Sequence, residues 1–148
     1  MDEGPATLSA GDRIEIHELA ARYGNAIDDR DWDALRQVFT DDAVLVINGF
    51  GTLDREDHGA DAIVTSMSHS RHPVAHHVTN VEVMCSGDTV TMQSKILGSG
   101  RGGRVGSADY HDVLRRTERG WRIAHRTVRL RAVEHQPSPT SARVDSPG

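Results

Sequence analysis

The first forty residues carry apolar side chains at helical spacing, whereas after residue 74 apolar and polar residues alternate. The helical stripe consists of Ile16, Leu19, Ala20, Tyr23 and Ile27. Residues spaced in this way share one face of a helix. The pattern predicts a first helix with Asp12 as its N-cap and Glu15 completing a capping box, ending near Asp29.

Three further elements are predicted before the alternation begins. A short second helix is expected over 32–39, with these side chains turned inward: Trp32, Leu35, Val38 and Phe39. The continuous apolar run 43–47 is typical of a buried strand, and the glycines within 49–52 bend the chain out of it. A third helix is expected over 56–68.

The alternating part of the chain predicts four strands in series, over 74–85, 89–98, 104–117 and 121–131. Short glycine-containing turns separate them, which indicates an antiparallel meander. In the first of these strands His76 and Val78 occupy even-numbered positions, whereas Val81 and Val83 occupy odd-numbered ones. In a regular strand the two pairs would face opposite sides of the sheet. A β-bulge near residues 79–80 would reconcile the two parities and bend the sheet strongly.

Helices before an antiparallel meander indicate an α+β fold, in which the helices cover one face of a curved sheet. The expected shape is a cone with a central pocket between sheet and helices. We expect one domain over residues 12–133, a flexible lead-in over 1–11 and a disordered tail over 134–148, where Pro and Ser replace the periodic pattern.

Composition narrows the class of protein. The chain has 148 residues, net charge −5 and a single cysteine, which favours a reducing compartment and excludes an internal disulfide framework. No run approaches the roughly 18 apolar residues that a membrane span needs, and the first residues contain no apolar signal segment. We therefore expect a cytoplasmic protein with no membrane and no nucleic-acid partner.

Charge is nevertheless uneven, because arginines gather near the end of the chain: Arg115, Arg116, Arg119, Arg122, Arg126, Arg129 and Arg131. They would form either an anion-binding or RNA-binding surface, or simply the solvated face of two strands. The overall negative charge favours the second interpretation.

The polar residues that suggest chemistry are Asp28, at the predicted helix end, and His76, at the start of a strand. A carboxylate that orients an imidazole makes a general base usable near neutral pH. The alternative for Asp28 is a solvated carboxylate, and the alternative for His76 is a core histidine with satisfied hydrogen bonds. Because neighbours on a strand face opposite sides, only one of His76 and His77 can enter a cavity.

Other site types fit less well. The histidines at 69, 72, 76 and 77 match no common zinc spacing. Residues 98–103 match Gly-x-Gly-x-x-Gly, but a strand follows instead of the helix that a dinucleotide site requires. Ser94 and Cys85 are possible nucleophiles, although no elbow-type turn presents either.

The chain resembles the SnoaL-like domain of the nuclear transport factor two-like superfamily in five blocks, at residues 16–23, 31–43, 76–80, 110–112 and 120–123. The resemblance spans roughly residues 12–128. At its polar positions the chain is most similar to scytalone dehydratase, lindane dehydrochlorinase and bile-acid dehydratases. The bend at 49–52 also resembles the dehydrochlorinase.

The resemblance implies an Asp28–His76 dyad with Tyr23 near the substrate, and leaves Asp29 and His77 as bystanders. A further polar group on the later strands is expected from Ser94, Tyr110, Asp112, Arg115 or Arg116. The shape of the substrate pocket is expected to come from Trp32, Phe39, Phe50, Met67, Met92 and Ile96.

Together these observations predict a lyase (dehydratase) or isomerase that needs no cofactor and no metal, and that acts on a small, largely apolar cyclic molecule. A homodimer through the outer sheet face is expected. The alternatives are a non-catalytic binding or complex-forming cone, and a polyketide cyclase or epoxide hydrolase in which Asp112 is the second carboxylate. A short dyad contact facing a cavity would favour the enzyme, and a sealed His76 the binding protein.

Overall fold

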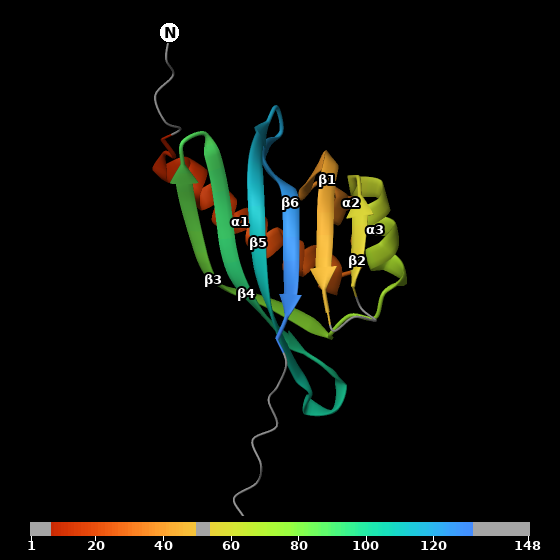
Figure 1. The fold of residues 1–148 in the computed structure, drawn as a ribbon. Coiled ribbons are helices and arrows are strands. Elements are labelled where there is room, and N and C mark those ends of the chain that lie inside the picture. The colour runs from red at the N-terminus through yellow and green to blue at the C-terminus, as the bar shows by residue number, and fades with distance from the viewer. Residues whose placement is uncertain (1–6, 50–53, 132–148) are drawn as a thin grey trace, which may run out of the picture.

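The computed structural model describes residues 7–49 and 54–131. It contains three α-helices and six strands (Figure 1). In chain order they are α1 (Ala10–Asp28), α2 (Trp32–Arg36), β1 (Phe39–Asn48), β2 (Arg55–His58), α3 (Ala60–His69), β3 (Ala75–Ser86), β4 (Thr89–Ser99), β5 (Val105–Thr117) and β6 (Gly120–Leu130). Residues 1–6 of the expected lead-in, residues 50–52 of the expected bend and the expected tail at 134–148 lie outside the described residues. Residues 10 and 11, expected to belong to the lead-in, are part of α1.

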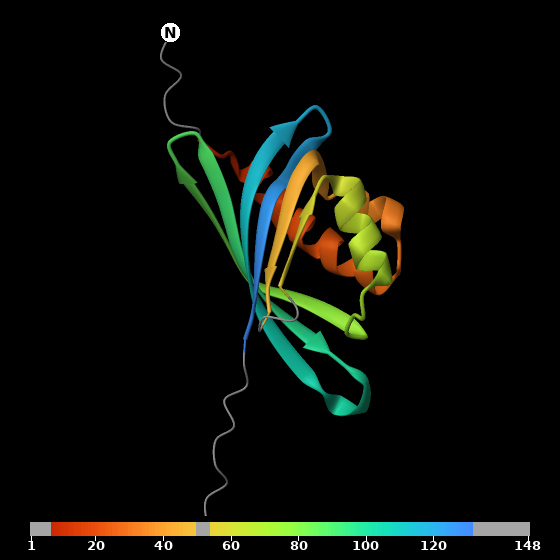
Figure 2. The same cartoon turned by 45° about the vertical axis from the view of Figure 1, so that its right-hand side comes forward.

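The six strands form one sheet in the order β2-β1-β6-β5-β4-β3. The predicted antiparallel meander from β3 to β6 is confirmed. The sheet is nevertheless mixed, because β1 pairs with β6 in parallel, a long-range pairing that no local pattern encodes. Figure 2 shows the helices on one side of the curved sheet, and the apolar core fills the space between them.

Helix α1 begins three residues earlier than predicted. Ser9 is the N-cap: its hydroxyl accepts from the Asp12 N–H at 3.1 Å, and the Asp12 carboxylate accepts from the Ser9 N–H at 2.9 Å. Asp12 is therefore the acidic member of the capping box. Glu15 instead accepts from the backbone N–H of Trp121 at 2.8 Å, and so ties α1 to the start of β6.

The second and third helices are shorter than predicted. Helix α2 ends at Arg36, because Phe39 is already paired with Ile123 of β6. Residues 55–58 form the edge strand β2, and Gly59, at φ +90°, separates them from α3. Only the later part of the segment predicted as helical is therefore helical.

The predicted bulge in β3 is present. The pairing of β3 with β4 shifts between Thr79 and Glu82, and Asn80 has φ +53°. A bulge of this kind bends a strand and increases its twist. It keeps His76 and Val78 on the same face of the sheet as Val83, where the core lies.

No helix in the described part of the chain is both long and apolar enough to span a membrane.

The left-handed conformation at the bulge predicts a clear substitution pattern. Asn80 is exposed, and a β-branched residue at φ +53° is strained, so Asn80→Val should lower the free energy of unfolding by about 1–2 kcal/mol. Asn80→Gly should stay within about 0.5 kcal/mol of the parent protein. Urea unfolding of both variants checks this; equal costs for the two substitutions would contradict it.

Candidate active site

Asp28 and His76 meet where α1 ends and β3 begins. The Asp28 Oδ1 atom lies 2.6 Å from Nδ1 of the His76 ring. The backbone N–H of His76 also donates to both carboxylate oxygens, at 3.1 and 2.9 Å. The side chain of His76 is 7% exposed and that of Asp28 is 20% exposed. The carboxylate therefore fixes both the position and the rotation of the imidazole.

A glycine allows α1 to approach β3 this closely. A Cβ atom at Gly24 would lie 3.2 Å from the carbonyl oxygen of His76 and 3.4 Å from the side chain of Val78. Glycine inside a helix ordinarily costs about 1 kcal/mol relative to alanine. Here it removes the side chain that would hold Asp28 away from His76.

The contact also sets the chemistry of the ring. An ionised carboxylate only accepts hydrogen bonds, so Nδ1 of His76 carries the hydrogen that points to Asp28. The neutral ring then keeps the lone pair of Nε2 for another partner. His77 pairs with Leu97 on the opposite face of the sheet and is exposed, in agreement with its expected bystander position.

His76 lines a cavity of about 270 Å³. Three expected site residues line it, namely His76, Ile96 and Tyr110. The remaining lining was not anticipated: Pro73, Gly98, Gly106, Ser107, Ala108, Val128, Leu130 and Arg131. Most of these residues are small or aliphatic, a class that sequence patterns cannot separate from ordinary core and turn residues.

Four of the aromatic and methionine residues expected around the pocket lie elsewhere. Phe39 and Met92 are fully buried and Met67 is 4% exposed, all within the apolar core. Trp32 packs against the edge of that core. None of these four lines the cavity, and Phe50 lies outside the described residues.

Tyr23 and Tyr110, the only tyrosines of the chain, meet in the interior. The Tyr110 hydroxyl donates to the Tyr23 hydroxyl at 3.4 Å, and the rings pack edge to face at 5.5 Å. Burial raises the pKa of Tyr110 well above its ordinary value. Tyr110 therefore stays a neutral hydrogen-bond donor, and it joins the cavity lining to Tyr23.

Beneath this pair lies a buried arginine that sequence reasoning missed. The guanidinium of Arg126 lies 4.1 Å from the ring centre of Tyr23 and 4.2 Å from that of Tyr110. It donates to the two oxygens of Asp112 at 2.7 and 2.8 Å. Both side chains of the ion pair are at most 1% exposed.

Arg126 was missed because the alternation of inward-facing and outward-facing residues shifts by one position within β6. Trp121 and Ile123 face the core, yet so do Arg126 and Val128, since the register with β5 shifts and leaves Ala124 unpaired. Counting backward from Val128 and Leu130 would have placed Arg126 inward. Counting forward from Trp121 places it outward.

The other later-strand candidates do not reach the cavity. Arg115 pairs with Asp42, and Arg116 contacts Asp12 and the face of Trp121, all at the surface. For these arginines the solvated interpretation is correct. Ser94 is buried, and its hydroxyl has no hydrogen-bond partner among the described residues.

His72 lies beside the dyad, with its ring 5.8 Å from that of His76. Its Nε2 atom lies 2.6 Å from the carbonyl oxygen of Met67. Burial lowers the pKa of His72, although the Met67 hydrogen bond acts in the opposite direction. The histidine therefore holds the connection between α3 and β3 in its neutral form.

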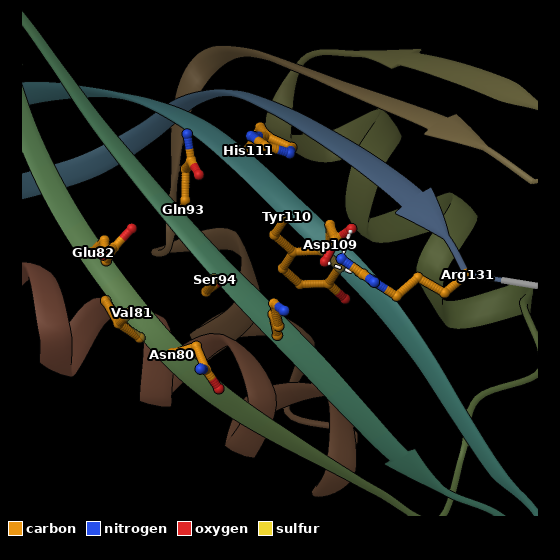
Figure 3. Close-up of a pocket in the computed structure, with 10 residues that line it drawn as sticks. Asn80, Val81, Glu82, Gln93, Ser94, Asp109, Tyr110, His111 and Arg131 are labelled. Carbon is orange, nitrogen blue, oxygen red and sulfur yellow. Dashed lines mark hydrogen bonds and ion pairs between the residues drawn. The ribbon is translucent and has the colours of Figure 1, made fainter.

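A second hollow, of about 400 Å³, lies on the face of the sheet away from the helices (Figure 3). Gln93, Asp109 and His111 open onto it, alternating with buried Ser94 and Tyr110. The Arg131 guanidinium holds the pKa of Asp109 below its usual range. Neither Asp28 nor His76 lines this hollow, although it shares Tyr110 and Arg131 with the dyad cavity.

Residues 7–49 and 54–131 contain no group of three His, Cys, Asp or Glu side chains placed to hold a metal ion.

A curved sheet, helices on its inner face and a polar pair at a cavity define an α+β cone with an internal site. The model of the SnoaL-like domain matches residues 9–127, and the chain belongs to that family.

The chain is also similar in sequence or in structure to several known proteins. An uncharacterized protein of Mycobacterium tuberculosis (Rv2910c) is 31% identical over 121 residues, which cover 78% of this chain and 82% of that protein. A candidate aromatic ring hydroxylase from Novosphingobium aromaticivorans is 32% identical with TM-score 0.68, covering 84% of this chain and 92% of the other. An NTF2-like protein with a cystatin-like fold from the same organism is 30% identical with TM-score 0.67, covering 81% and 82%.

The buried ion pair predicts a non-additive response. Arg126→Met leaves Asp112 charged and unpaired, and should lower the free energy of unfolding by about 3–5 kcal/mol. Arg126→Met combined with Asp112→Leu removes both charges and should recover most of that loss. Denaturant unfolding of the parent, of Arg126→Met, of Asp112→Leu and of the double variant checks this, and additive losses in the double variant would contradict it.

The lowered pKa of His72 predicts a loss of stability in mild acid. Unfolded histidine titrates near 6.5, so below that pH the unfolded chain binds a proton that folded His72 rejects. The free energy of unfolding should therefore fall as the pH drops from 7 toward 5. His72→Gln should make this fall shallower, whereas His77→Gln on the outer face should not; identical slopes for both variants in urea titrations would contradict the prediction.

Proposed function

We propose that the chain is a cofactor-independent lyase, of the dehydratase or elimination type, or an isomerase, in which the Asp28–His76 dyad takes a proton from carbon. The observation that supports this most directly is the 2.6 Å contact between Asp28 and a His76 ring that also lines a cavity. A general base must reach its proton in this way, with an orienting group behind it.

In the proposed mechanism, Nε2 of His76 accepts a proton from a carbon next to an electron-withdrawing group. The electron pair of the broken C–H bond then forms a double bond. In an elimination the leaving group departs with its own electron pair, and in an isomerisation the proton returns to another carbon. Asp28 stabilises the imidazolium that forms in between.

Tyr23 and Tyr110 supply the polar end of the proposed site. Tyr110 lines the cavity and its hydroxyl is bonded to that of Tyr23. Neutral phenol groups can donate to an oxygen that gains negative charge, or to a departing hydroxyl. The guanidinium of Arg126 packs against both rings and keeps them in place, with its own charge paired to Asp112.

The alternatives receive less support. An epoxide hydrolase would need Asp112 to activate water, but Asp112 is 2% exposed and both of its oxygens bind Arg126. A non-catalytic binding protein would not require a carboxylate that holds both the ring and the backbone N–H of a histidine at a cavity wall. The name of the Novosphingobium relative, a candidate aromatic ring hydroxylase, agrees with a cyclic substrate.

Proton abstraction can be tested before the substrate is known. We expect the protein in D₂O to catalyse deuterium exchange into, or elimination from, members of a panel of cyclic ketones, hydroxyketones and halogenated rings, followed by mass spectrometry. His76→Ala and Asp28→Asn should each lower the rate by about 10²–10⁴ while the fold is retained.

The neighbouring exposed residues give matched controls, because His77→Ala and Asp29→Asn change the same side-chain types outside the site. Both should keep parental rates. Full turnover in His76→Ala and Asp28→Asn would overturn the proposed mechanism, and a panel without any exchange would favour the binding protein.

A further inference from the structure

Three residues on neighbouring strands, beginning with His76, lie directly opposite one another across the sheet. His76 of β3 pairs with Gly98 of β4, and Gly98 pairs with Gly106 of β5. Facing residues on neighbouring strands share one face of the sheet. The two positions that follow His76 across the sheet therefore carry no side chain, and all three residues line the cavity.

The two glycines have different surroundings. A Cβ atom at Gly98 would lie 2.7 Å from Cγ of Pro73, so the proline ring rests directly on the backbone of β4. The segment that carries Pro73 is held on both sides. The Val74 N–H donates to the Ser99 carbonyl at 2.7 Å, and His72 binds the Met67 carbonyl. Pro73 on Gly98 is consequently a fixed wall of the cavity.

Gly106, in contrast, borders open space. A Cβ atom there would meet no described atom within 4 Å, and the residue is exposed although it lines the cavity. Its φ does not lie in the left-handed region, so the backbone accepts any residue type. The cavity is thus open to solvent where β5 lacks a side chain.

We propose that Gly106 is the mouth of the dyad cavity and the position that limits the size of its occupant. A molecule reaches the His76 ring by passing over the bare backbone of Gly106, and the Pro73–Gly98 wall stops it on the other side. The route concerns the cavity alone; that the occupant is a substrate rests on the proposed function.

The lining indicates the chemistry of the occupant. Besides the dyad histidine and Tyr110 it is mainly aliphatic, and the charge of Arg131 is engaged by Asp109 at 2.7 Å. A volume of about 270 Å³ lies just below the range of about 300–1,000 Å³ usual for drug-sized ligands. The mouth therefore admits a neutral molecule of one or two rings and excludes anions of the same shape.

Access can be measured without a substrate. Diethyl pyrocarbonate acylates the accessible nitrogen of histidine, and peptide mass spectrometry separates His76 from the adjacent His77. Gly106→Phe should slow the labelling of His76 at least tenfold, and Gly106→Ala should slow it less. Labelling of exposed His77 should not change, and it serves as the internal reference.

Val105→Phe is the matched control, since Val105 is the preceding residue of β5, is 58% exposed and faces the other side of the sheet. It should leave the labelling of His76 unchanged. Equal slowing by Val105→Phe, parental labelling in Gly106→Phe, or no labelling of His76 in the parent protein would overturn the proposal. Thermal unfolding verifies that each variant is folded.

The class of occupant is tested with indole and its anionic analogue indole-3-carboxylate, observed through the NMR signals of the His76 ring. Indole should shift these signals in the parent protein but not in Gly106→Phe, and the carboxylate should not shift them. Equal binding of the carboxylate would overturn the proposed class. Neither readout requires turnover. The experiments can therefore overturn the proposed mouth at Gly106 without affecting the proposed dyad chemistry, and the dyad chemistry can be wrong while the proposal for Gly106 holds.

Discussion

The structure of the site depends on one carboxylate that joins the end of a helix to the beginning of the curved sheet. Asp28 accepts from the backbone and from the ring of His76, so the same group positions the strand and orients the imidazole. Gly24, one turn earlier, gives α1 the clearance for this contact. Any shift of α1 away from β3 would separate the two residues.

The curvature of the sheet determines which side chains lie on the same face as the Asp28–His76 contact. The bulge at Asn80 in β3 and the unpaired Ala124 in β6 each shift by one position which residues of the strand face inward. The first change allows His76 and the later part of β3 to share the inner face. The second turns Arg126 inward, beneath Tyr23 and Tyr110. The two bulges thus assemble the polar interior from strands that are otherwise regular.

Polar and apolar side chains occupy different parts of the interior. Asp112, Arg126 and the two tyrosines form one buried polar cluster, and the cavity beside His76 has mainly small and aliphatic walls. A buried ion pair of this kind contributes little net stability but requires both partners. It lies against the two tyrosines at the inner end of the site, whereas the lining near Gly106 is mainly aliphatic.

The sequence by itself determined what local periodicity encodes. The stripe from Ile16 to Ile27 predicted α1, the alternation after residue 74 predicted the meander, and the parity change near residue 79 predicted the bulge. It also indicated Asp28 and His76 as the candidate pair, because their elements and faces follow from those patterns and from the resemblance to the family.

Only the tertiary structure decided what depends on pairing between distant segments. The parallel contact of β1 with β6 ended α2 early and placed Phe39 in the sheet. The shift at Ala124 moved Arg126 into the core, where a count from the start of β6 does not place it. Besides Ile96 and Tyr110, the cavity walls came from residues such as Pro73 and two glycines instead of Trp32, Phe39, Met67 and Met92. A cavity is defined by where side chains are missing, and that depends on which strands lie side by side.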